Sequence, residues 1–173
     1  MLTRIRRAIV ISAAALVVAM ITSLSISAQD RAEFSFRAID ADTVTSESLR
    51  GEVVVLAFGA SWLPLTRNQM EGVKKLADQY AGRGVAAYWV STDSDSPKSK
   101  NYVSDEELRA LARKYKVTVL RDPDGAISKR LGVDQLPSVV VIDKQGNVSG
   151  TVGGLDPNVD LAKQLAPRLE KIL

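Results

Sequence analysis

The chain has 173 residues, of which 46 % are apolar and 25 % charged, a composition typical of one globular domain preceded by a leader. It contains no cysteine and no histidine, which excludes disulfides, thiol chemistry and the usual zinc sites. Its formal charge of +3 comes from three arginines near the start; without them, 20 of the 23 basic residues remain against 20 acidic ones. Electrostatics therefore give no reason to expect nucleic-acid binding.

The first 29 residues have the pattern of a secretory leader. Arg4, Arg6 and Arg7 precede a charge-free stretch over residues 8–29, and residues 26–28 offer a signal-peptidase site. The same stretch is about long enough to span a bilayer, so an uncleaved N-terminal membrane anchor is the alternative. Either interpretation places the domain, residues 30–173, outside the cytoplasm, in the periplasm or attached to the membrane.

The sequence pattern in the first half of the domain predicts two strands and a helix. Residues 34–41 alternate enough for a short strand, and residues 43–51 are expected to form a loop. The apolar run 53–58 is typical of a strand covered on both faces. A turn at 59–62 leads into a helix expected over residues 64–81, with Pro64 in its first turn. One face of this helix is apolar: Met70, Val73, Leu76, Ala77 and Tyr80.

The next segment predicts a second long strand at 85–91 and a polar loop at 92–99. Ser104 and Glu107 have the spacing of a capping box, which predicts a helix from there to Tyr115. A short strand at 117–120 follows, then a turn at 122–125 and a short helix through Leu131.

The last segment predicts a hairpin with strands at 139–142 and 147–152. Asp156 is expected to cap the final helix, with Pro157 at its first position. The apolar residues of that helix are Val159, Leu161, Leu165, Leu169 and Ile172. Strands that alternate with helices, followed by a hairpin, indicate an α/β fold with a central mixed sheet flanked by helices.

The chain resembles the thioredoxin superfamily, most closely its TlpA and ResA type. The matching residues around the first turn are Phe58, Ala60, Ser61, Trp62, Pro64, Arg67 and Met70, and residues 121–150 form a second matching block. The resemblance covers about residues 34–172. It implies a thioredoxin-like fold with the helix-and-strand insertion of the TlpA type.

The chain departs from that family at its redox motif, which reads Trp62, Leu63, Pro64, Leu65 and Thr66. Leu63 and Thr66 stand where the family has cysteines, and Ala57 stands where many members have a buried acidic or polar residue. Disulfide exchange requires a thiolate, so this activity is excluded for the chain alone. Thr66 lacks a histidine base, and its hydroxyl is expected to bond within the first helical turn.

The resemblance also implies a cis peptide bond between Leu136 and Pro137, facing the degenerate motif. Trp62, Leu63, Leu65, Leu136 and Pro137 are therefore the candidate peptide-binding groove. Two alternatives stay open. Leu136–Pro137 can be only a turn that determines the fold, and the N-terminal segment can cover the apolar residues.

No metal or cofactor site is expected. Asp93, Asp95, Asp122 and Asp124 do not have the spacing of a calcium loop, and they are interpreted as solvated turn residues. The glycines at 82, 84, 153 and 154 lack the context of a phosphate loop.

The hypothesis from the sequence is an exported thioredoxin-fold protein that has lost its redox centre. It would bind an envelope protein or peptide without catalysis. The alternatives are a member of a thiol-disulfide pathway that works with a separate cysteine-bearing protein, and a purely structural domain.

Overall fold

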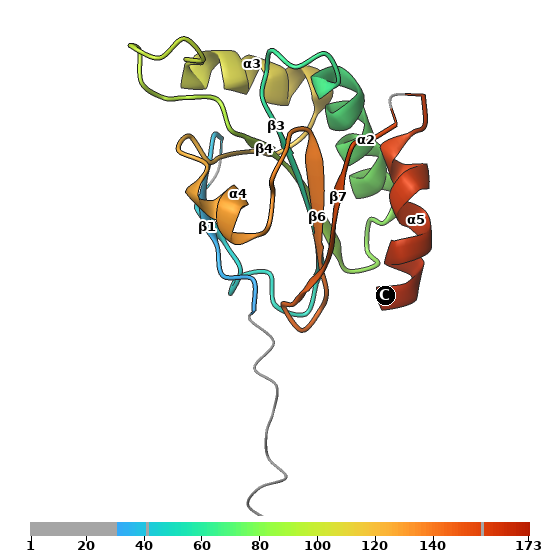
Figure 1. Ribbon diagram of the computed structural model, residues 1–173. Helices are drawn as coiled ribbons and strands as arrows, with labels where there is room; N and C mark the ends of the chain where they lie inside the picture. Colours follow the sequence, from blue (N-terminus) through green and yellow to red (C-terminus); the bar gives the residue numbers. More distant parts are fainter. Residues whose placement is uncertain (1–30, 41, 157) are drawn as a thin grey trace, which may run out of the picture.

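The computed structural model describes residues 31–40, 42–156 and 158–173, so the leader expected over residues 1–29 lies outside the described residues. A mixed sheet has the strand order β2-β1-β5-β4-β3-β6-β7 (Figure 1). The strands are β1 (Ser35–Ala38), β2 (Val44–Thr45), β3 (Val53–Gly59), β4 (Val85–Ser91), β5 (Val119–Arg121), β6 (Ser138–Ile142) and β7 (Val148–Gly153). The helices are α2 (Thr66–Gln79), α3 (Asp105–Tyr115), α4 (Ala126–Arg130) and α5 (Leu161–Ile172).

Strand β3 lies in the interior of the sheet, between β4 and β6, and all of its residues are buried. It runs parallel to β4, where Leu56 lies opposite Tyr88, and antiparallel to β6, where Leu56 lies opposite Val140. Both faces of the strand are covered, which explains why its sequence is an uninterrupted apolar run.

Alternate residues of β3 belong to two apolar layers. Val53, Val55 and Ala57 pack with the buried faces of α2, α3 and α5. Val54, Leu56 and Phe58 pack with the N-terminal segment and with the residues that follow α4. Figure 1 shows α2 and α5 side by side on one face of the sheet and α4 on the other. The predicted α/β architecture is confirmed. The two ends of β3 lie at opposite edges of this core.

Several predicted boundaries are confirmed closely. Strand β4 spans the predicted residues 85–91, and α3 begins at Asp105 behind a complete capping box formed by Ser104 and Glu107. The hairpin of β6 and β7 is also present. The segment expected to be a loop at 43–51 contains the short strand β2, which pairs with β1.

The predicted start of the helix at Pro64 was wrong, because α2 begins at Thr66. The backbone N–H of Leu63 donates to the carbonyl of Ala60, and that of Thr66 donates to the carbonyl of Leu63. These two consecutive tight turns occupy residues 60–66, so Pro64 lies ahead of the helix and is exposed.

The predicted cap of the last helix was also wrong. Helix α5 begins at Leu161, and Asp160 caps it by accepting a hydrogen bond of 2.8 Å from the N–H of Ala162. Asp160 also pairs with Lys75 of α2, which ties this end of α5 to its neighbour. Asp156 instead accepts from the N–H of Asn158, and Val159 precedes the helix with 42 % of its surface exposed. Pro157, expected at the first helical position, lies outside the described residues.

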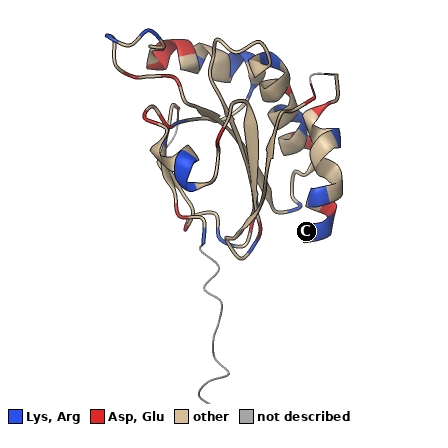
Figure 2. Cartoon of the chain, in the orientation of Figure 1, with Lys and Arg blue, Asp and Glu red and all other residues tan. Residues whose placement is uncertain are grey.

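Basic and acidic residues are interspersed along the described part of the chain (Figure 2). Helix α3 has acidic residues in its first turn and basic residues in its last, an order that complements the helix dipole. Within the part of the chain that the structure describes, no helix is long and apolar enough to cross a membrane.

Candidate functional site

The turn between β3 and α2 presents an aromatic side chain to solvent. Trp62 is 61 % exposed, whereas Leu63 and Leu65 on either side of Pro64 are half-buried. Thr66 is buried, and its hydroxyl donates to the carbonyl of Ala60 in the preceding turn. The prediction that this hydroxyl bonds within the helix was therefore wrong. Its hydrogen bond closes the turn and keeps the Thr66 hydroxyl buried.

A buried carboxylate lies directly beneath this turn. Asp93, at 1 % exposure, accepts hydrogen bonds from the backbone N–H of Ser61 at 2.8 Å, the Ser61 hydroxyl at 3.2 Å and the Ser91 hydroxyl at 2.9 Å. The sequence interpretation of Asp93 as a solvated turn residue was wrong. Burying a carboxylate is unfavourable unless donors surround it, and the two serines supply these donors.

Gln69 forms a second polar contact under the turn. Its side chain is buried, and its amide nitrogen donates to the carbonyl of Phe58 at 3.0 Å and to that of Ser138 at 3.3 Å. Phe58 lies near the end of β3, and Ser138 follows Pro137 at the start of β6. Gln69 thereby links the strand that leads into the turn to the strand that follows the proline. Gln69 was not among the predicted site residues, because nothing in its local sequence indicates the carbonyl groups that it binds.

The peptide bond between Leu136 and Pro137 is cis, as the family resemblance implied. Leu136 is 37 % exposed and lines, together with Trp62, an open cavity of about 330 Å³. The rest of the lining is mixed: polar residues such as Asn101, Lys129 and Asp134 lie beside the apolar Ala60, Pro123 and Val133.

Of the five residues of the candidate groove, Trp62 and Leu136 thus line this cavity. Leu65 lines a much smaller hollow beside Val159. Leu63 and Pro137 are half-buried and line neither hollow.

Arg121 fixes the loop that contributes Asn101 to this cavity. Its side chain is 1 % exposed and donates to the carbonyl of Asp93 at 3.2 Å, to that of Val103 at 3.1 Å and to the Asp105 carboxylate at 2.7 Å. Both ends of the segment between Asp93 and Asp105 are therefore tied to one guanidinium. That segment contributes Asn101 to the cavity.

Asp122 is also buried, contrary to its interpretation as a solvated residue. It accepts hydrogen bonds from the N–H groups of Ile127 at 3.1 Å and Ser128 at 2.7 Å, and so holds the start of α4. Both buried aspartates thus bind donors of the protein itself. Among the residues that the structure describes, no three acidic side chains are grouped as a metal site would require.

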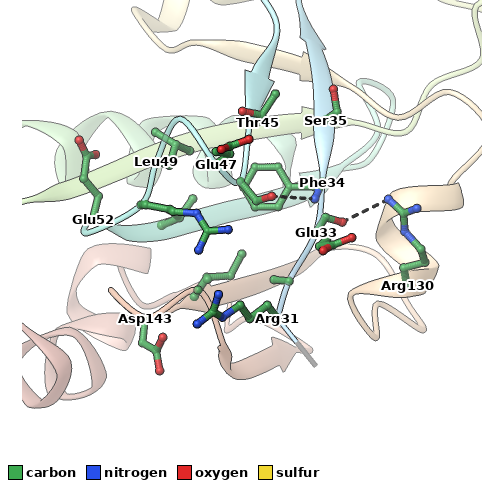
Figure 3. Close-up of a pocket in the computed structure, with 16 residues that line it drawn as sticks. Arg31, Glu33, Phe34, Ser35, Thr45, Glu47, Leu49, Glu52, Arg130 and Asp143 are labelled. Carbon is green, nitrogen blue, oxygen red and sulfur yellow. Dashed lines mark hydrogen bonds between the residues drawn. The ribbon is translucent and has the colours of Figure 1, made fainter. Parts of the chain in front are cut away.

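A second cavity, of about 390 Å³, lies at the other end of β3 (Figure 3). Its apolar lining includes Phe34, Val54 and Ile142, and its charged residues are Arg31, Glu33, Glu47, Arg50, Glu52, Arg130 and Asp143. Figure 3 shows Arg130 donating to the backbone carbonyl of Glu33, at 3.2 Å. Charges of both signs surround this hollow, so it does not favour a ligand of one sign.

These features define a class of protein. The fold is thioredoxin-like: it has a mixed sheet of this strand order, a turn at the carboxyl end of β3 and a cis proline ahead of β6. Its two redox positions, Leu63 and Thr66, carry no thiol.

The chain belongs to the AhpC/TSA family, whose model matches residues 28–151. The thiol:disulfide interchange protein DsbE of Pseudomonas aeruginosa is 27 % identical over 130 residues, which are 75 % of this chain and 67 % of the relative. Thiol-disulfide oxidoreductase ResA of Bacillus thuringiensis is 26 % identical over 127 residues, which are 73 % and 69 % of the two chains. The resemblance to the ResA type is thereby confirmed.

Solved structures give the same fold. The pneumococcal exposed lipoprotein thioredoxin of Streptococcus pneumoniae aligns with a TM-score of 0.61 and 25 % identity, over 79 % of this chain and 99 % of that chain. A thiol:disulfide interchange protein of the thioredoxin family from Chlorobium tepidum aligns with a TM-score of 0.63 at 20 % identity, over 80 % and 94 % of the two chains. At this identity the second match supports the fold alone.

Proposed function

We propose that the protein is an exported, non-catalytic binding module that holds an extended protein or peptide segment of the cell envelope at the Trp62 turn. The observation that carries this proposal is the pairing of Trp62 and Leu136 along one open cavity, although both are large apolar residues in contact with solvent. Exposed aromatic and aliphatic side chains beside a cavity are typical of interaction sites. The same turn without thiols supports binding rather than exchange.

The leader supports export. Three arginines followed by a charge-free apolar stretch are the pattern of a signal peptide or an N-terminal anchor. One relative of known structure is described as an exposed lipoprotein, which is consistent with a position outside the cytoplasm. N-terminal sequencing of the protein recovered from cells decides between cleavage and anchoring.

The binding test is a comparison of captured proteins. Wild-type protein, the Trp62→Ala/Leu136→Ala double variant and a Gln145→Ala control are immobilised and exposed to the same envelope extract. Gln145 is exposed in the hairpin turn at the opposite end of β6. We expect proteins retained by the wild type and the control to be lost from the double variant. Identical retention by all three proteins would exclude the Trp62 turn as the binding site.

The thiol-dependent alternative is favoured by the names of the relatives, which are thiol-disulfide exchange proteins. In that case the chain would assist a separate cysteine-bearing protein. An insulin-reduction assay that pairs the chain with a thioredoxin tests this alternative. A rate of insulin reduction above that of the thioredoxin alone would favour the thiol-dependent alternative. An unchanged rate would favour the binding module.

A further inference from the structure

Asp93 is hydrogen-bonded to residues that hold two parts of the cavity lining, Trp62 and Asn101. Its carboxylate holds Ser61, the residue directly before Trp62, through both the backbone N–H and the hydroxyl. Its backbone carbonyl accepts a hydrogen bond from Arg121, which also fixes the segment that contributes Asn101. A single residue thus contacts the support of both parts of the lining.

The contacts of the carboxylate are directed at the turn rather than at the core. Beside the two bonds from Ser61, it accepts one from Ser91, the last residue of β4. The backbone N–H of Asp93 in turn donates to the Ser91 hydroxyl, at 3.2 Å. Ser91 therefore links Asp93 to the sheet, and the hydrogen bonds from Ser61 link Asp93 to the turn. A buried carboxylate is strongly unfavourable without hydrogen-bond donors. The need for these donors therefore keeps Ser61, and with it the turn, in place.

We infer that Asp93 is a positioning residue of the binding site, which fixes the orientation of Trp62 relative to Asn101 and so sets the width of the cavity. The inference deepens the proposed binding function and rests on it. Asp93 has no surface with which to touch a partner, since it is 1 % exposed. Its effect on binding is therefore exerted through Ser61 and Trp62.

The test observes Trp62 in the free protein. Protein labelled with 5-fluorotryptophan should give two ¹⁹F resonances, one from exposed Trp62 and one from buried Trp89, and Trp62→Phe assigns them. We expect Asp93→Ala to broaden the Trp62 resonance or shift it toward that of the free amino acid, while the Trp89 resonance stays in place. Asp93→Asn keeps one acceptor oxygen and should give an intermediate change.

The matched control is Asp143→Ala. Asp143 accepts backbone N–H bonds from Gln145 and Asn147 in the hairpin turn, far from Trp62 along β6, and its loss should leave the Trp62 resonance unchanged. If Asp93→Ala does not fold, Ser61→Ala and Ser91→Ala each remove one donor and should give smaller changes of the same kind. An unchanged Trp62 resonance in folded Asp93 or serine variants would overturn the inference, as would equal changes at both tryptophans.

The two proposals fail separately. An unchanged Trp62 resonance in the folded Asp93 variants overturns the positioning role of Asp93, whether or not a partner binds. Conversely, unchanged capture by the Trp62→Ala/Leu136→Ala variant overturns the binding function, even where the Asp93 variants release Trp62.

Discussion

The indole N–H of Trp89 donates a hydrogen bond of 2.9 Å to the side-chain oxygen of Gln69. Both side chains are buried, and the chain at Gly59 passes so close that a Cβ there would lie 2.5 Å from the same oxygen. The Gln69 side chain thereby donates through its amide nitrogen to two backbone carbonyls and accepts through its oxygen from Trp89, beneath the Trp62 turn. Glycine at position 59 leaves room for this oxygen, whereas even alanine would crowd it.

Gln69→Glu should destabilise the protein at neutral pH by about 3 kcal/mol, since an ionised carboxylate cannot donate to the carbonyls of Phe58 and Ser138. Burial among acceptors raises the pKa of the new carboxyl in the folded state, so the loss should grow as the pH rises and shrink when the group is protonated. Urea unfolding at acidic and neutral pH measures both effects. Gln145→Glu, at an exposed position, is the control, and an equal loss in both variants would contradict this account.

Gly72→Ala should lower the free energy of unfolding although alanine is the better helix former. The added Cβ would lie 2.4 Å from the Cβ of Leu161 on α5. Overpacking of this kind costs roughly 1–3 kcal/mol, whereas the gain in helix propensity is about 1 kcal/mol. Leu161→Ala should not rescue the variant, because alanine retains the clashing Cβ. A melting temperature above that of the parent would mean that α2 and α5 are less closely packed.

Ser104→Ala should cost about 1 kcal/mol of stability, because the Ser104 hydroxyl accepts the N–H of Glu107 in the capping box of α3. Thermal unfolding of this variant is compared with that of Ser96→Ala, which changes an exposed loop serine of the same insertion. Coincident melts for the two variants would show that the cap contributes nothing.

The stability of the protein should fall in acid partly through Asp105. Two hydrogen bonds from Arg37 and one from Arg121 lower the pKa of its carboxyl from 3.8 to about 2. Since the folded-state pKa is the lower one, the stabilisation is present above about pH 4 and is lost as the pH falls toward 2. Asp105→Asn should therefore be less stable than the parent at neutral pH, and the difference should close over that interval. Asp134→Asn is the exposed control, and a difference independent of pH would contradict the assignment.

The double variant Leu63→Cys/Thr66→Cys should form an intramolecular disulfide under mild oxidant and reopen with dithiothreitol. The N–H of Thr66 already donates to the carbonyl of Leu63, so the two residues lie in one tight turn. Position 66 is the first residue of α2, where the helix dipole stabilises a thiolate. Thiol titration and mass measurement follow the reaction, and the single-cysteine variants are the controls. Only mixed or intermolecular disulfides would show that the turn has another geometry.

Local sequence patterns predicted most helices and strands. The features that these patterns did not predict depend on contacts between residues far apart in the chain. Strand β3 was predictable because burial on both faces requires an apolar run, and α3 because its capping box spans four consecutive residues. The start of α5 was not, since Asp156 and Asp160 are equally good caps by type, and pairing with Lys75 favours Asp160. Cis Pro137 followed only from the family resemblance.

The polar support of the site could not be predicted from the sequence. Asp93 binds Ser61, which lies 32 residues away in the chain, and Gln69 binds Ser138, which lies 69 residues away. In the sequence the aspartate stands among polar loop residues, and the glutamine lies on a helix that carries several other polar and charged residues. Nothing local distinguishes either of them from a solvated side chain.

The two ends of β3 make the molecule suitable for oriented attachment to a solid support. Arg31, the first described residue, lines a cavity with Val54 at one end of the strand, and Trp62 follows Gly59 at the other. The two ends are roughly 20 Å apart at the usual strand rise. A biosensor chip that captures the protein near Arg31 would hold it by the end of β3 opposite Trp62, so that the chip surface would not cover the indole.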